Sequence, residues 1–177
     1  VGLDLHSFWF DELFTARLLE PLDGTTLLSR IATDVHPPVY LVALSLFSHG
    51  GGDSDAALRA FSAVAACGAV VVFVATTRSA FSLPARLFGA ALATGSLFWF
   101  VQAQNVRSHA LCLLLSAGIL GLGLRLLQDK DRGRRRPAAL FGLMLLGAFT
   151  HFYMLYVALG VLGMLVLLQR RDRATMV

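Results

Sequence analysis

Long apolar runs are the dominant pattern of the sequence. They cover residues 58–77, 87–106, 110–124 and 138–168, and they contain no Asp, Glu or Lys, with Arg59 at the start of the first run as their one arginine. A bilayer has a hydrocarbon core about 30 Å thick, which about 20 helical residues can cross. The pattern therefore predicts membrane-spanning helices rather than the amphipathic helices of a soluble protein.

Basic residues gather in three places between these runs. The groups are Arg78 with Arg86, residues 125–136 and residues 170–173. Short loops rich in Lys and Arg are typical of the cytoplasmic side of membrane proteins. We therefore expect all three groups to lie on that side.

This placement requires an even number of spans between one basic group and the next. Residues 87–106 and 110–124 supply one pair, and the last run divides into a second pair, about 138–150 and 153–168. Residues 58–77 then enter from the outside. The prediction is an all-α integral membrane protein, a fragment of a polytopic helical bundle with about five spanning helices.

The segment before residue 58 is predicted to be non-cytoplasmic. Its apolar stretch, residues 39–47, is too short to span, and it lies between Pro37-Pro38 and the glycines at 50–52, so we expect a short interfacial helix there. The expected organisation is an extracytoplasmic loop with interfacial helices at 1–57 and a transmembrane bundle at 58–177. The chain begins without Met in a polar, aromatic stretch, so we also expect it to be an excerpt of a longer protein.

Composition agrees with the membrane prediction. Hydrophobic residues make up 56% of the chain, charged residues only 15%, and the mean hydropathy is +0.70, whereas a soluble domain has about 25% charged residues. The pI near 9.7 does not indicate nucleic-acid binding, because the basic residues are divided among short loops. Cys67 and Cys112 lie inside predicted spans without metal-ligand spacing, which favours a packing role.

Ionisable chemistry is concentrated on the predicted outer face. All five histidines and eight of the eleven acids fall there, together with four arginines that do not follow the positive-inside tendency. The acids are Asp4, Asp11, Glu12, Glu20, Asp23, Asp34, Asp53 and Asp55, and the arginines are Arg17, Arg30, Arg59 and Arg107.

Two groups of carboxylates are candidate catalytic residues. Asp11 and Glu12 follow an aromatic pair, where they can act as first-turn acids of an interfacial helix or supply a partly desolvated general base. Asp34 and His36 precede the diproline, where Asp34 can cap a helix or be fixed with His36 against the Asp11 site.

Basic and aromatic residues offer further candidates near the same face. Arg59 and Arg107 can be snorkelling anchors or a site for a phosphate headgroup. His109, His151 and Tyr153 lie at outer turns, either as interfacial aromatic residues or as supporting residues of a shared cavity. A divalent cation is possible, but no ligand pair has a recognisable metal-binding spacing, so no metal ligand is assigned.

Five motifs, taken in order, resemble the polytopic glycosyltransferases of the GT-C superfamily, in the branch of protein O-mannosyltransferases, bacterial family 39 and aminoarabinose-transferase-like enzymes. The resemblance covers nearly the whole chain. The motifs are Trp9-Phe10-Asp11-Glu12, Asp34-Val35-His36-Pro37-Pro38-Val39-Tyr40, Ala57-Leu58-Arg59-Ala60-Phe61-Ser62, Gln104-x-x-Arg107-x-x-Ala110-Leu111 and Thr150-His151-Phe152-Tyr153. Members often have Glu-Ala-Arg-x-Tyr where this chain has Asn105-Val106-Arg107-Ser108-His109, a difference that bears on donor and metal preference.

The resemblance implies an inverting transfer of a sugar from a polyprenyl-phosphate donor to an acceptor hydroxyl of a protein, lipid or glycan at the outer membrane face. It implies that Asp11 is the base and that Asp34 and Arg59 line the site. Polyprenyl phosphate leaves without protonation, so one carboxylate suffices, and Arg59 with Arg107 would stabilise the phosphate charge. The expected location is a bacterial plasma membrane. The lipid bilayer is an expected partner, and nucleic acid is not.

Two other classes of protein remain as alternatives. A transporter or lipid flippase would use acids and histidines as a proton relay inside the membrane, but the predicted spans lack acidic residues. A non-catalytic GT-C relative or assembly subunit would keep the fold without sugar transfer. The sugar, the acceptor, the metal requirement and the oligomeric state are not encoded in a recognisable pattern.

Overall fold

The computed structural model describes residues 7–20, 24–52, 54–128 and 133–174. Within them the chain forms nine α-helices and one short 3-10 turn, η1 (Thr77–Ser79), and no β-strand. The all-α prediction is confirmed for these residues. Six residues assigned to a membrane face by the sequence lie outside them: Asp4, His6, Asp23, Asp53, Lys130 and Arg132.

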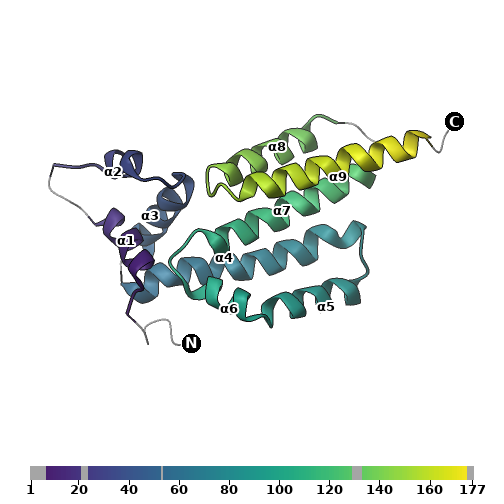
Figure 1. The fold of residues 1–177 in the computed structure, drawn as a ribbon. Helices are drawn as coiled ribbons and strands as arrows, with labels where there is room; N and C mark the ends of the chain where they lie inside the picture. The colour runs from purple at the N-terminus through teal and green to yellow at the C-terminus, as the bar shows by residue number, and fades with distance from the viewer. Residues whose placement is uncertain (1–6, 21–23, 53, 129–132, 175–177) are drawn as a thin grey trace.

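Two long helices, α4 (Asp55–Thr76) and α7 (His109–Gln128), form the centre of the bundle. Both are long and apolar enough to cross a membrane, and they lie side by side along most of their length (Figure 1). Small residues line their interface, where alanines of α4 pack on Ala110 and Gly121 faces Thr76. Small side chains let membrane helices approach closely. The predicted spans at 58–77 and 110–124 are thus confirmed as helices of spanning length.

The span expected at 87–106 is broken in the structure. It forms two separate helices, α5 (Leu83–Thr94) and α6 (Leu97–Gln104), and the chain bends by 68° between them. The break falls at Gly95 and Ser96, where the Ser96 side chain accepts a hydrogen bond from the backbone N–H of Trp99 at 3.2 Å. Serine in this position begins a new helix, so the span predicted at 87–106 is not one straight helix.

The last two helices, α8 (Arg135–Ala148) and α9 (Met154–Ala174), form a hairpin packed on α7. Ile119 of α7 and Met154 of α9 are almost fully buried in their common core. At about 1.5 Å per residue, α8 is roughly 21 Å long, and the apolar part of α9 ends at Leu168. Among the described residues, two helices are therefore long and apolar enough to span, or three if α5 and α6 form one broken span, and the five spans that the sequence predicts are not shown.

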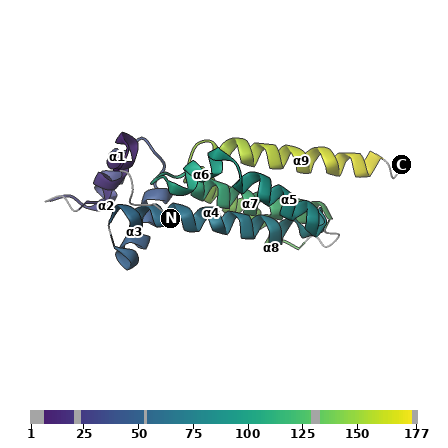
Figure 2. The same ribbon diagram turned by 90° about the horizontal axis from the view of Figure 1, so that it is seen from below.

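The N-terminal helices lie at one end of this bundle. They are α1 (Phe10–Leu19), α2 (Leu27–Thr33) and α3 (Val39–Gly51), and they gather where α6 ends and α7 begins (Figures 1 and 2). The short helix predicted at 39–47 exists as α3. Two buried side chains, Leu44 of α3 and Val106 before α7, fill the core between this group and the bundle.

Backbone hydrogen bonds join this end to the α8–α9 turn. The first N–H group of α3, that of Val39, donates to the carbonyl of Phe149 at 3.0 Å. The first N–H groups of a helix have no partner within it, and the last carbonyls have none either. The end of α8 thus supplies the acceptor that the first N–H group of α3 lacks within its own helix. This contact places His36 close to His151.

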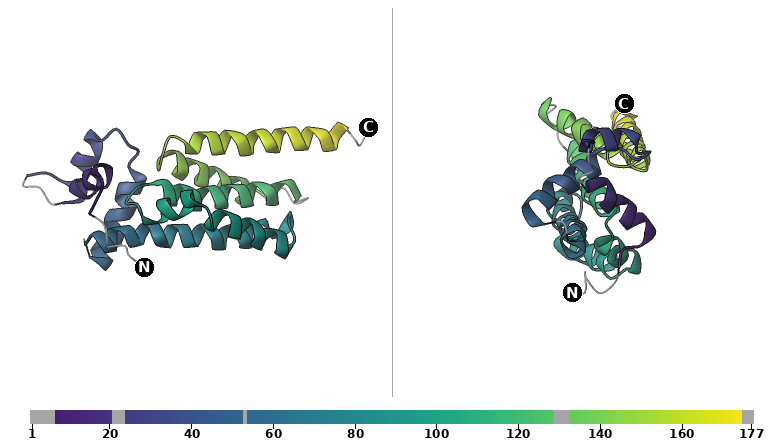
Figure 3. Two further views of the ribbon diagram at one scale, coloured as in Figure 1. Left: turned by 60° about the horizontal axis from the view of Figure 1, so that its bottom comes forward. Right: turned by 90° about the vertical axis from the view of Figure 1, so that its left-hand side faces the viewer.

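The opposite end of the bundle holds the basic groups. The end of α4, the start of α5, the end of α7 and the start of α8 lie together there, away from α1 to α3 (Figure 3). Arg78, Arg86, Arg125 and Arg134 belong to these segments. The separation of basic and acidic ends agrees with the asymmetry of the sequence, while the side of the membrane that each end faces stays a prediction.

Candidate active site

The first turn of α1 points its two carboxylates in different directions. Consecutive residues of an α-helix are about 100° apart around its axis, because a turn has 3.6 residues. The side chain of Glu12 is 2% exposed, whereas that of Asp11 is 68% exposed. The adjacent acids therefore have different surroundings, although the sequence treats them as a pair.

Glu12 is held by three separate segments. Arg59 of α4 donates to both carboxylate oxygens, at 3.3 Å from Nε and 3.0 Å from Nη2. The backbone N–H of Val106 donates at 2.8 Å, and that of Trp9 at 3.2 Å. One carboxylate thus joins α1 to the bundle and to the turn before α7.

These hydrogen bonds decide the charge of Glu12. Burial raises the pKa of the carboxyl, but the hydrogen bonds from Arg59, Val106 and Trp9 outweigh burial and hold the pKa below its ordinary value. Glu12 is therefore a carboxylate at neutral pH, and its oxygens are already occupied by donors.

Arg59 is enclosed on its other sides. It is 6% exposed, its Nη2 also donates to the carbonyl of Ser7 at 3.3 Å, and its guanidinium lies 4.9 Å from the centre of the Phe8 ring. Its predicted role in binding a donor phosphate remains a prediction. The contacts that it makes in this structure hold the start of α1 on α4.

Arg107 occupies the open side of the same junction. Its Nη2 lies 3.7 Å from a carboxylate oxygen of Asp11, and its Nη1 lies 3.4 Å from the Asp11 carbonyl. The Arg107 side chain is 25% exposed. An exposed acid and a partly exposed arginine therefore face one another at the surface, where both can reach a bound molecule.

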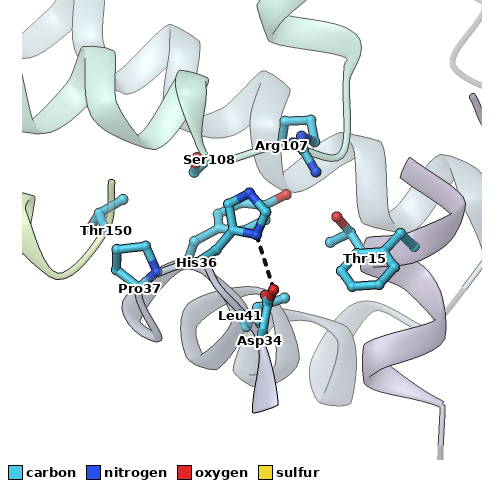
Figure 4. A pocket seen from close by; sticks show the side chains of 10 residues that line it. Thr15, Asp34, His36, Pro37, Leu41, Arg107, Ser108 and Thr150 are labelled. Atoms are coloured by element: carbon cyan, nitrogen blue, oxygen red, sulfur yellow. Dashed lines mark hydrogen bonds and ion pairs between the residues drawn. The ribbon is translucent and has the colours of Figure 1, made fainter. Parts of the chain in front are cut away.

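A small cavity lies beside this pair and contains the second acidic motif. Its volume is about 20 Å³, which is room for about one water molecule. Asp34 accepts a hydrogen bond from Nδ1 of His36 at 3.0 Å, and the Asp34 side chain is 3% exposed while that of His36 is 41% exposed. Figure 4 shows this dyad with Arg107 and Thr15 around it.

The predicted histidine and tyrosine residues form a chain of rings next to this cavity. The ring centres of His109 and His151 are 5.5 Å apart, and those of His151 and Tyr153 are 4.7 Å apart. Burial lowers the pKa of His151, and the electrostatic interactions of His151 with His36 and Arg107 lower it further. His151 is therefore neutral at pH 7, and it cannot add a charge to the site.

Sequence reasoning assigned no role to four polar residues that line the cavity, namely Thr15, Tyr40, Ser108 and Thr150. Tyr40 lies in the predicted short helix and Thr150 in a predicted motif, but neither has a pattern that distinguishes it from a packing residue. The described residues contain no group of three or more His, Cys, Asp or Glu side chains that could hold a metal ion.

The sequence matches the family described as dolichyl-phosphate-mannose-protein mannosyltransferase over residues 35–176. The chain belongs to this family. The family implies a glycosyltransferase kind of function, and the apolar helices agree with a multi-pass membrane protein. No curated protein and no solved structure matches the sequence.

The family match and the site overlap only in part. Arg59, Arg107 and His151 lie inside the matched region, but Asp11 and Asp34 precede it. The family therefore supports a glycosyltransferase kind of function, while the roles of the two acids rest on their position beside Arg107.

Proposed function

We propose that the protein transfers a sugar from a polyprenyl-phosphate donor to a hydroxyl group at the membrane face where α1 to α3 lie. The observation that carries this proposal is the position of Asp11 beside Arg107, which brings a proton acceptor and a phosphate ligand to one exposed junction of a membrane glycosyltransferase family member. The polyprenyl chain stays in the bilayer, and its headgroup reaches the end of the bundle.

In this mechanism Asp11 removes the proton of the acceptor hydroxyl as the oxygen attacks the anomeric carbon. The bond from that carbon to the phosphate oxygen breaks, and the configuration inverts. Arg107 stabilises the charge that grows on the leaving phosphate, because a guanidinium donates two parallel hydrogen bonds to such a group. No acid is needed, since the polyprenyl phosphate is a weak base.

Glu12 and Arg59 are positioning residues in this mechanism, because they hold Asp11 and Arg107 in place. Glu12 accepts the Val106 N–H at 2.8 Å, and the next residue in the chain is Arg107. The buried ion pair thus fixes both partners of the exposed pair, because Asp11 precedes Glu12 and Arg107 follows Val106. His36, oriented by Asp34, lies across the cavity as a further polar contact for the donor headgroup or the acceptor.

The cavity itself is too small for a sugar, since it has room for about one water. The donor sugar is therefore proposed to bind over the exposed Asp11–Arg107 junction, with the cavity below it. The transporter alternative gains no support, because no acidic residue lies within the helices of spanning length beyond the first turn of α4.

The test uses the full-length protein in membrane vesicles supplied with polyprenyl-phosphate mannose, and it measures the release of polyprenyl phosphate. Asp11→Asn is expected to lower the rate by about 10²-fold or more, the usual contribution of a general base. Asp55→Asn is the matched control, because Asp55 is an exposed acid in the first turn of α4 at the same end of the molecule. An unchanged rate for Asp11→Asn at equal protein levels contradicts the proposal.

A further inference from the structure

A second feature lies at the other end of the bundle, away from the candidate active site. A groove of about 500 Å³ runs between α4 and α5 next to η1, where Figure 1 shows the two helices side by side. Its lining is apolar along α4 and basic at the end, and it consists of Val70, Val71, Val74, Ala75, Arg78 and Arg86.

Arg86 ties the two walls of the groove together. Its Nη1 donates to the carbonyl of Val74 in the last turn of α4, where carbonyl groups have no partner within the helix. Its Nε is buried without a hydrogen-bond acceptor in the described part of the chain. A buried donor without an acceptor costs free energy, so an anionic oxygen bound in the groove would stabilise this arginine.

None of the described residues that line the groove is acidic. The sequence contains no Asp or Glu between Asp55 and Asp129, and neither Arg78 nor Arg86 forms an ion pair with a described carboxylate. Arg78 is exposed. The pair of arginines is therefore complementary to a bound anion.

The surroundings place this anion at a membrane surface. Phe81 and Leu83, in the link between the two arginines, are 50% and 52% exposed, as expected of residues that enter the edge of a bilayer. Val71, on the groove wall, is 67% exposed. A phospholipid offers the matching combination, with a phosphate at this depth and an acyl chain alongside an apolar helix.

We propose that the α4–α5 groove binds an anionic phospholipid of the leaflet at the basic end of the bundle. The lipid phosphate lies between Arg78 and Arg86, and one acyl chain lies along Val70, Val71 and Val74. This site is separate from the transfer of sugar, and it anchors the broken α5–α6 segment against α4.

The experiment measures lipid binding to the full-length protein in an uncharged detergent, with phosphatidylglycerol as probe and phosphatidylcholine as comparison. Tighter binding of phosphatidylglycerol is expected. Arg78→Gln should weaken that preference about fivefold, the usual effect of one basic residue at an anionic membrane surface. Arg134→Gln is the control, because Arg134 is exposed at the same end but lies at the start of α8, outside the groove.

A second variant tests the acyl-chain half of the site. Val71→Trp fills the groove without changing charge, and the exposure of Val71 makes misfolding a small risk. It should weaken phosphatidylglycerol binding although both arginines remain. Three results would each overturn the proposal: equal affinity for the two lipids, an equal loss in Arg134→Gln, or no effect of Val71→Trp. The last is expected if another helix of the full-length protein occupies the groove.

Discussion

Replacing Glu12 by Gln should open the junction between α1 and the bundle. The substitution keeps the shape of the side chain but removes the negative charge that faces Arg59, a residue that is only 6% exposed. Breaking a buried ion pair by removing one partner costs about 3–5 kcal/mol. The N–H of Trp9 can still donate to the amide oxygen of the glutamine, so the start of α1 is not lost.

The loss of stability should be local, because the Glu12–Arg59 ion pair joins α1 to α4 and does not lie between α4 and α7. Hydrogen exchange of the full-length protein, measured on peptides that cover residues 8–20 and 101–109, reports this opening. The Val106 amide, which donates to Glu12 at 2.8 Å, should exchange about 10²- to 10⁴-fold faster, the equivalent of that free energy. Peptides from α7 to α9 should not change.

Two further variants make this prediction refutable. Glu20→Gln removes an exposed charge at the end of the same helix and should have little effect. The double variant Glu12→Gln/Arg59→Met removes both charges and should exchange no faster than Glu12→Gln alone, because residues that form one pair do not contribute additively. Unchanged exchange at Val106, or additive losses in the double variant, would show that the ion pair does not hold the junction.

Three other outcomes are expected. The contribution of Glu12, whose pKa lies below the ordinary 4.5, is fully present above that value and is lost as pH falls through the lower folded pKa. The protection of the Val106 amide, measured against its intrinsic exchange rate at each pH, should therefore fall on acidification in the wild type and not in Glu12→Gln. Gly121→Ala should destabilise the bundle by about 1–3 kcal/mol in thermal unfolding, because its Cβ would lie 2.0 Å from the Thr76 hydroxyl oxygen, whereas Gly142→Ala meets nothing within 4 Å. Arg107→Gln should raise the pKa of His151 towards its ordinary value in an NMR titration, since Arg107 is one of the charges that lower it.

The helices could be predicted from the sequence where one property decides them. Residues 58–77 and 110–124 are apolar throughout apart from Arg59, and both became helices of spanning length. Residues 87–106 are equally apolar, but Gly95 and Ser96 stop one helix and start another. Hydropathy does not detect such a break, because it averages over the residues that end a helix.

The candidate site, like the helices, could be predicted from the sequence only in part. The sequence places Asp11, Asp34, Arg59 and Arg107 at one end of the molecule, and the structure brings them there. The sequence alone does not show that Arg59 pairs with Glu12, because the two residues are 47 positions apart in the chain. One signal was present: an arginine at the start of an apolar helix needs a partner, and a nearby acid is the natural one.

The two adjacent acids of α1 allow a positioning role to be distinguished from a catalytic role by experiment. Glu12 contacts Val106 and Asp11 contacts Arg107, so two neighbouring residues of one segment meet two neighbouring residues of another. A shift of either segment therefore moves the exposed pair. Under the proposed function, Glu12→Gln should slow sugar transfer and speed exchange at Val106 together, whereas Asp11→Asn should slow transfer without a change in exchange. If both variants change exchange alike, Asp11 is a structural residue and the base must lie elsewhere.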